Sequence, residues 1–314
     1  MKTIASFLAA CSVLFAQFTF PSGLGLTTWK GAPAPYVGPF DGFTASQGLW
    51  DINVRLLSSY TGDLITVRRS SDNATNSFTY VPATGKLDTN AITAWSGSDT
   101  VYITTVHDQS GGGRNFSQAT EGLQPKLLNA GTFYSINGEP SMQKTATGVR
   151  LHAPVTGTIT ELNIITVGKS TDAMPVSGAL MSAGDNTGSV GHSLVGPDIA
   201  SAPSYEYWVY CLGVGLPIYT LGNSASYAYP HTFSMSVDSA ATNMVFNIDT
   251  LVTANENGIL SVPLTSLSWL DDRSSVSSDA AWASGSMALF SPIPADQTAV
   301  MRYYTNRFAT TYIP

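Results

Sequence analysis

The sequence predicts an all-β protein, folded as an antiparallel β-sandwich (jelly roll) with a few short helices. Charged residues make up only 11% of its 314 residues, against roughly 25% in an average soluble protein. Serine, threonine, asparagine and glycine take the place of the missing charges, and 28 glycines and 17 prolines divide the chain. This composition is typical of a protein with many strands, many turns and a neutral polar surface.

The N-terminal 42 residues differ from the rest of the chain. Residues 3–20 carry no charge and follow Lys2, which is typical of a secretory signal peptide. An apolar arm that packs on the same protein or on a neighbouring subunit is the alternative, and Leu8-Ala9-Ala10-Cys11 resembles a lipoprotein cleavage box. Glycine and proline in residues 21–42 predict an extended connector. We therefore expect an apolar N-terminal arm or signal peptide with its connector over residues 1–42, and the sandwich over residues 43–314.

Three segments have the apolar spacing of helices. The first covers residues 46–59, the second covers residues 88–95 with Asp88 as its N-cap, and the third begins at Pro294. The apolar stripes consist of Trp50, Val54 and Leu57 in the first, Ile92 and Trp95 in the second, and Val300, Tyr304 and Phe308 in the third.

Most of the remaining chain has the alternating or β-branched pattern of strands. One of these segments, Leu162–Val167, is apolar on both faces, as a central strand would be. The predicted strands are Val101–Val106, Leu162–Val167, Tyr205–Leu212, Phe233–Val237, Met244–Ile248 and Met287–Phe290.

Charge and cysteine content exclude several classes of function. Fourteen basic against 21 acidic residues give a formal charge of −7, and without a basic run we expect no nucleic-acid partner. Cys11 and Cys211 are the only cysteines, so no disulfide framework holds the fold, and we expect two free thiols. The histidines are too scattered for a metal site; they are His107, His152, His192 and His231.

The most specific part of the sequence lies between residues 56 and 140. It contains Ser58-Ser-Tyr-Thr-Gly62, Val67-Arg-Arg-Ser-Ser-Asp72, Val106-His-Asp-Gln-Ser-Gly-Gly-Gly113 and the turn Asn137-Gly-Glu-Pro140. This order resembles the concanavalin A-like (LamG-like) module of phage tail and other virion proteins. It is also similar to the catalytic domain of the family 54 α-L-arabinofuranosidases. The resemblance implies a concanavalin A-like sandwich and leaves the activity open.

Most polar residues of this segment are expected to hold the fold together. Asp108, with Gln109 beside it, precedes the glycine run that starts at Gly111, where short polar side chains bond the amides of a tight turn. Arg68 and Arg69 point to opposite faces of one strand, and one of them is expected to pair with Asp108 or Asp72. We expect no cofactor; a calcium ion on turn carboxylates is an alternative, although the chain has no EF-hand pattern.

The resemblance to arabinofuranosidases implies a catalytic glutamate that this sequence does not supply. A retaining glycosidase needs two carboxyl groups, one as nucleophile and one as acid/base. The family places its nucleophilic glutamate after a Cys-Cys pair, and the nearest stretch here, Ala179–Thr187, lacks both cysteines. Asp185 is the nearest carboxylate, and no glutamate occurs between Glu161 and Glu206. We therefore expect no catalytic residues and no turnover.

One strand carries a candidate glycan-binding face. Glu206, Trp208 and Tyr210 alternate along Tyr205–Leu212, and aromatic rings beside a carboxylate suit sugar recognition. An aromatic core strand is the alternative interpretation.

Together these observations favour a non-enzymatic surface protein of a phage-like virion, such as a tail fibre, spike or capsid decoration. The expected partners are other virion subunits, further copies of the chain and a host surface glycan. A secreted glycoside hydrolase resembling α-L-arabinofuranosidase and a carbohydrate-binding surface lipoprotein are the alternatives, and these would be secreted or cell-surface proteins.

Overall fold

The computed structural model describes residues 35–43, 46–159, 161–171, 178–184, 191–198, 205–211, 214–221, 229–237, 243–249, 251–257, 264–270, 282–290 and 297–308. The chain forms two compact units, residues 1–35 and 36–314, and the described strands and helices all belong to the second unit.

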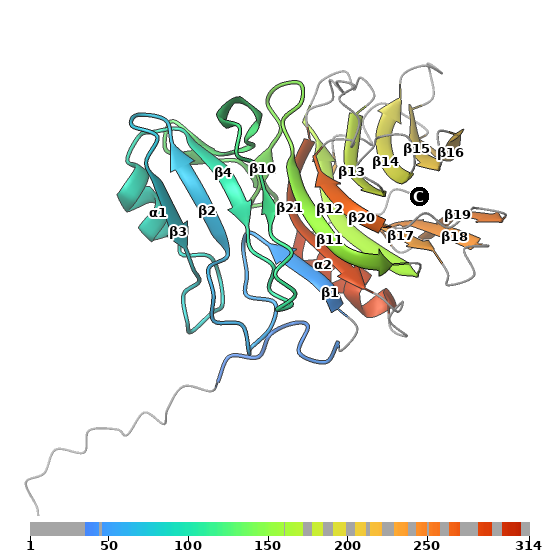
Figure 1. The fold of residues 1–314 in the computed structure, drawn as a ribbon, viewed down its shortest axis with the longest axis horizontal. Coiled ribbons are helices and arrows are strands. Elements are labelled where there is room, and N and C mark those ends of the chain that lie inside the picture. The colour runs from blue at the N-terminus through green and yellow to red at the C-terminus, as the bar shows by residue number, and fades with distance from the viewer. Residues whose placement is uncertain are drawn as a thin grey trace, which may run out of the picture. The chain divides into compact units, whose positions relative to one another are not determined.

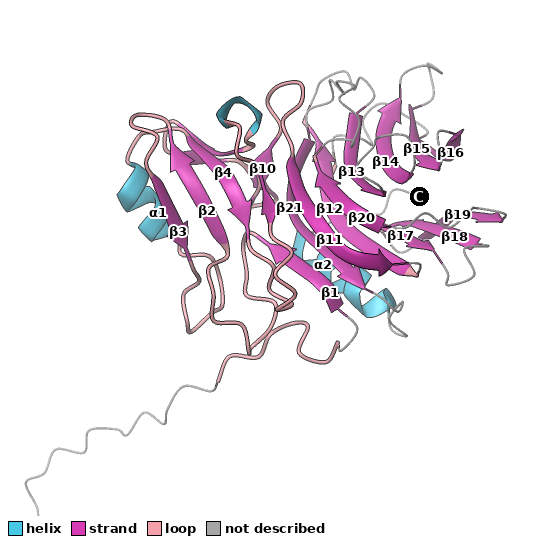
Figure 2. Cartoon of the chain, viewed as in Figure 1, coloured by secondary structure: helices cyan, strands magenta, loops and turns pink. Residues whose placement is uncertain are grey.

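The second unit is an antiparallel β-sandwich with few helices (Figures 1 and 2). One layer, called layer A here, runs in the order β11–β20–β13–β14–β15–β16. Layer B runs in the order β1–β21–β12–β17–β18–β19. The fold class predicted from the sequence is confirmed.

The two layers consist of long strands. Those of layer A are β11 (Leu151–Ile159), β20 (Leu264–Trp269), β13 (Gly178–Gly184), β14 (Gly191–Asp198), β15 (Tyr205–Cys211) and β16 (Val214–Leu221). Those of layer B are β1 (Ser46–Asp51), β21 (Trp282–Phe290), β12 (Leu162–Ser170), β17 (His231–Val237), β18 (Asn243–Ile248) and β19 (Leu251–Asn257).

Shorter strands from residues 65–143 join the two layers, because β5 pairs with β11 of layer A and β10 pairs with β21 of layer B. These strands are β2 (Ile65–Arg69), β3 (Thr75–Phe78), β4 (Val101–Val106), β5 (Phe116–Ser117), β6 (Lys126–Asn129), β7 (Thr132–Phe133), the hairpin of β8 (Ser135–Ile136) and β9 (Glu139–Pro140), and β10 (Met142–Gln143). The helices are α1 (Thr89–Ser96), the short 3-10 turn η1 (Glu121–Leu123) and α2 (Gln297–Phe308).

Two apolar clusters hold the layers in place. The larger cluster collects buried side chains from both layers, with Trp50, Phe116 and Trp269 in contact at its centre. The second cluster lies between layer B and α2. Strand β12 serves both, because Ile164 belongs to the first cluster and Ile165 to the second. This burial of both faces confirms the prediction of a central strand.

Several predicted elements appear at their predicted places. Strand β4 has the predicted bounds, and β12, β15, β17, β18 and β21 contain or overlap the other predicted strands. Helix α1 begins after its predicted N-cap, since the Asp88 carboxylate accepts a hydrogen bond from the Ala91 N–H. Helix α2 buries its predicted stripe.

The helix predicted over residues 46–59 is wrong. This segment begins as β1, which pairs with β21. Leu49 and Trp50 both lie buried, one in each apolar cluster, so the apolar residues serve two faces of a strand and not one face of a helix. Tertiary pairing therefore overrides the helical spacing.

Part of the predicted connector packs into the sandwich. Phe40 is fully buried and contacts Phe290, Tyr303 and Tyr304 edge-on or tilted. Arg55 lies 4.1 Å from the centre of the Tyr36 ring. The packed unit therefore starts at about residue 36, earlier than the predicted boundary at residue 43.

Candidate functional site

The turn after β4 is organised by the carboxylate of Asp108. One carboxylate oxygen accepts hydrogen bonds from the N–H groups of Leu49 (3.1 Å) and Ser110 (2.9 Å), and the other accepts from the Arg114 N–H (3.0 Å). Asp108 is buried. Its side chain therefore joins the turn to β1 and satisfies amides that would otherwise lack partners.

Gln109 ties the same turn to the segment after β1. Its side-chain oxygen accepts from the Leu56 N–H at 2.7 Å, and its side-chain nitrogen donates to the carbonyls of Asp51 and Val54. Gly111 follows with φ +85°, a conformation that favours glycine. The neighbouring His107 is half-buried; burial lowers the pKa of its imidazole, which bonds the Thr66 hydroxyl at 2.9 Å.

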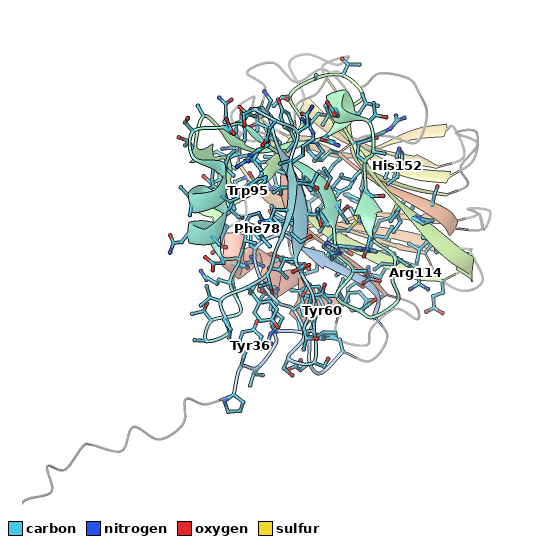
Figure 3. All side chains as sticks on the ribbon, turned by 60° about the vertical axis from the view of Figure 1, so that its left-hand side comes forward. Tyr36, Tyr60, Phe78, Trp95, Arg114 and His152 are labelled. Atoms are coloured by element: carbon cyan, nitrogen blue, oxygen red, sulfur yellow. The ribbon has the colours of Figure 1, made fainter. Side chains whose placement is uncertain are left out.

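The two arginines of β2 have separate partners. Arg69 binds Asp72 through two hydrogen bonds of 2.8 and 2.7 Å, and these bonds from Arg69 lower the pKa of Asp72 to about 2. The Arg69 guanidinium also lies 4.9 Å from the centre of the Trp95 ring, which packs on Phe78 (Figure 3).

Arg68 is buried instead, where it bonds the side chains of Gln124 (2.8 Å) and Asn73 (2.6 Å). In this part of the chain the named polar residues therefore hold backbone and turns together.

A line of polar residues crosses layer A. The strand register places them opposite one another in the order Ser117, His152, Ser268, Ser182, Ser193 and Tyr210. The residues beside them in β11, β20 and β13, such as Leu151, Trp269 and Met181, belong to the large apolar cluster. Because side chains alternate along a strand, His152, Ser268 and Ser182 lie on the opposite face of layer A from that cluster.

These hydroxyls and the imidazole form a row of hydrogen-bonding groups. The Ser268 hydroxyl bonds the His152 Nδ1 at 2.8 Å. Ser182 is fully buried, and among the described residues its hydroxyl has no hydrogen-bond partner. His152 is half-buried on β11 (Figure 3). Ser182 and Ser268 are fully buried, so of these three residues only His152 is partly exposed.

The predicted glycan-binding residues lie in the same layer. Glu206, Trp208 and Tyr210 belong to β15, and Tyr210 occupies the position in the polar row opposite Ser193. The register also sets Glu206 directly opposite Asp198 of β14. Residues directly opposite in an antiparallel pair have Cβ atoms about 4.5–5.5 Å apart. Two acidic residues therefore occupy opposite register positions at one end of the β14–β15 ladder.

Sequence reasoning missed His152, Ser182, Ser268 and the opposition of Asp198 to Glu206. A signal for His152 exists, because Leu151, Ala153 and Val155 alternate with polar or proline positions. The pairing of β14 with β15 depends on register across a connection and leaves no local signal.

Other predictions lie outside the described residues or find no support among them. Asp185 and Cys11 are outside the described part of the chain, and so is the predicted arm over residues 1–20. Within the described ranges, no group of three or more potential ligands is placed to hold a metal ion. Of the helices in those ranges, none is long and apolar enough to span a membrane.

Comparison with known proteins links the chain to arabinofuranosidases. Residues 44–155 match the family model described as alpha-L-arabinofuranosidase B, catalytic. Alpha-L-arabinofuranosidase B of Emericella nidulans is 42% identical over 67 residues, which are 21% of this chain and 13% of that protein. A probable alpha-L-arabinofuranosidase B of Aspergillus terreus is 39% identical over 67 residues, with the same shares of both chains. The aligned segment is thus a small part of these relatives.

Solved structures of arabinofuranosidases share the fold. An arabinofuranosidase complexed with arabinofuranosyl-α-1,2-xylobiose aligns with a TM-score of 0.65 and 17% identity, over 85% of this chain and 64% of that chain. A glutamate-to-glutamine mutant of a family 54 α-L-arabinofuranosidase, soaked with 4-nitrophenyl α-L-arabinofuranoside, aligns with a TM-score of 0.66 and 16% identity, over 88% and 66%.

These findings correct the functional prediction. The chain is related to the catalytic domain of family 54 arabinofuranosidases through residues 44–155, and it has their sandwich fold. The predicted role as a non-enzymatic virion protein, whether phage tail, capsid decoration or host attachment, is wrong, because the matching proteins are arabinofuranosidases. A virion surface location is likewise unsupported.

Proposed function

We propose that this chain is a glycoside hydrolase that cleaves α-L-arabinofuranosidic bonds. The observation that carries the proposal is the match of residues 44–155 to an arabinofuranosidase catalytic domain. The similarity of the fold to solved arabinofuranosidases over 85–88% of the chain is consistent with the proposal.

The candidate catalytic residues of this proposal are Asp198 and Glu206, which belong to strands β14 and β15 of layer A. Retaining glycosidases use two carboxyl groups about 5–5.5 Å apart, and Asp198 and Glu206 are acidic residues that the strand register places opposite each other. Like charges at opposite positions destabilise a strand pair, which favours a functional reason for this placement. Asp185 is the rival candidate, because of its place in the stretch nearest to the family's nucleophile.

In the proposed reaction one carboxylate attacks the anomeric carbon and forms a glycosyl ester as the glycosidic bond breaks, while the second carboxyl group, in its protonated form, donates its proton to the departing oxygen and becomes a carboxylate. A water molecule then attacks the ester, and the second carboxylate accepts the proton of this water.

The test is hydrolysis of 4-nitrophenyl α-L-arabinofuranoside by the full chain and by Asp198→Asn, Glu206→Gln and Asp185→Asn. We expect wild-type turnover, and a fall of about 10²–10⁴-fold in kcat for Asp198→Asn and Glu206→Gln, because each loses a group that acts in the transition state. Glu121→Gln, which alters an exposed carboxylate of η1, is the control and should keep wild-type activity. If only Asp185→Asn loses activity, Asp185 is the catalytic residue in place of Asp198 and Glu206. Absence of turnover in the wild type would contradict the proposal.

Binding of arabinofuranosyl groups without hydrolysis is a second candidate function. The observation that favours it is the lack of any glutamate between Glu161 and Glu206, where the resemblance places the nucleophile. Calorimetric titration with arabinofuranosyl-α-1,2-xylobiose separates the two candidates, because a binding domain would retain the intact sugar while a hydrolase would release arabinose.

The uncharged segment after Lys2 has the pattern of a signal peptide. We therefore propose secretion, which mass determination of the mature N-terminus tests. A chain that retains residues 1–20 would contradict it.

A further inference from the structure

A cavity lies outside layer A, next to the short connecting strands and α1. It has a volume of about 340 Å³, within the range of about 300–1,000 Å³ that small-molecule sites occupy. The residues that define its chemistry are Asn53, Lys86, Thr89, Thr93, Phe133 and Glu139. Asn53 lies just after β1 and Lys86 lies between β3 and α1, while Thr89 and Thr93 belong to α1, Phe133 to β7 and Glu139 to β9.

The β8–β9 hairpin fixes Glu139 at this cavity. Its two turn residues, Asn137 and Gly138, have φ of +48° and +85°, as a tight hairpin turn requires. The Asn137 side chain donates to the Phe308 carbonyl at the end of α2, at 2.5 Å. The hairpin is therefore anchored to a helix of the sandwich and is not a free loop.

The charges at the cavity balance one another. Lys86 Nζ lies 3.2 Å from one Glu139 oxygen, and Arg307 lies 3.4 Å from the other. Arg307 in turn binds the fully buried carboxylate of Asp51. Two cations and two carboxylates thus alternate along one chain of contacts. A strongly charged ligand gains little here, which favours a neutral one.

The remaining lining groups suit a neutral polyol. Asn53 is buried, and among the described residues neither polar atom of its side-chain amide has a hydrogen-bond partner. The exposed Thr93 hydroxyl donates to the Thr89 carbonyl at 2.9 Å and keeps its lone pairs as acceptors, while the half-buried Phe133 offers an apolar ring for sugar C–H groups. Lys86 and Glu139 add a donor and an acceptor.

We infer that this cavity is a second saccharide-binding site, which holds one sugar unit of a neutral polysaccharide away from the site proposed in layer A. It depends on different residues from the proposed hydrolysis and does not require turnover. Its role would be to keep the domain on a polymeric substrate.

The test is affinity electrophoresis of the full chain in gels that contain neutral arabinoxylan, with polygalacturonate gels as the charged comparison. Thr93→Trp fills the cavity with a bulky ring, and we expect it to weaken retardation about tenfold in apparent affinity. Ala94→Trp introduces the same ring at the next residue of α1, which is exposed and does not line the cavity, and it should keep wild-type retardation. Lys86→Ala, which removes an exposed donor without altering the core, is expected to weaken binding about fivefold.

The outcomes of this experiment either support or overturn the second saccharide-binding site. Retardation by arabinoxylan that Thr93→Trp and Lys86→Ala both reduce, at unchanged melting temperature, supports it. Equal retardation of all variants, no retardation of the wild type, or retardation by polygalacturonate alone would overturn it. Hydrolysis of 4-nitrophenyl α-L-arabinofuranoside should not change in Thr93→Trp, so failure of the hydrolase proposal and failure of this one are distinguished.

Discussion

The Asp108 carboxylate stabilises a turn and also connects this turn to a distant strand. Asp108 accepts three backbone hydrogen bonds, and one of their donors lies on β1, 59 residues away in the sequence. Removal of the carboxylate leaves buried N–H groups without partners, and each such group costs about 1–3 kcal/mol.

We therefore predict that Asp108→Ala lowers the free energy of unfolding by about 3 kcal/mol or more. Chemical denaturation checks this value. Asp99→Asn serves as the control, because Asp99 accepts a hydrogen bond from an exposed serine hydroxyl, and it should change stability by less than about 1 kcal/mol. An unchanged stability of Asp108→Ala would contradict the structural role.

Side-chain interactions could be predicted from the sequence where the two partners are close together in the chain. The link between Arg69 and Asp72 spans three residues, and the Asp88 cap reaches three residues into α1. The Ser268–His152 contact spans 116 residues and the ion pair of Arg307 with Asp51 spans 256. Such contacts require knowledge of strand order, which local patterns do not contain.

At the scale of elements, burial on two faces explains why β1 was predicted as a helix. Leu49 and Trp50 follow one another without alternation because β1 is buried on both sides. Of the three residues at helical spacing only Trp50 belongs to β1, and Val54 and Leu57 lie after its end. The same burial explains why α2 was predictable, since one face of a terminal helix packs on one apolar cluster.

Helix α2 is joined to β1 by an ion pair, and this connection gives an element-scale prediction. Asp51 is fully buried and receives two hydrogen bonds from Arg307. Removal of one partner from a buried pair leaves an uncompensated charge, at a cost of about 3–5 kcal/mol. Arg307→Met should therefore destabilise the protein by about that amount in thermal or urea unfolding.

The same helix supplies the matched control. Arg302→Met changes an exposed arginine of α2 and should leave stability within about 0.5 kcal/mol of the wild type. Equal losses of stability in Arg307→Met and Arg302→Met would show that the ion pair does not stabilise the packing of α2 on β1.

At the scale of the whole molecule, sequence likeness and fold likeness cover different lengths. The family match ends at residue 155, whereas the fold of the arabinofuranosidases aligns over 85–88% of the chain. The first region contains turns held by hydrogen bonds with specific side chains, such as Asp108 and Gln109. Long strands need only the correct apolar pattern, so different sequences build the same layers.

The extent of the folding unit is the last prediction, and it follows from the packing of residues 36–43. Phe40 is fully buried among aromatic rings of β21 and α2, and Phe43 packs against the same cluster. Each large apolar side chain contributes about 1.5–3 kcal/mol when buried. Deletion of residues 1–35 should therefore leave the melting temperature unchanged, because the second unit keeps these rings. Deletion of residues 1–43 should lower stability by about 4 kcal/mol, equivalent to roughly 8–16 °C in a domain of this size. Calorimetry of both truncated chains beside the full chain measures the difference, and equal melting temperatures for the two truncations would place the start of the sandwich after residue 43.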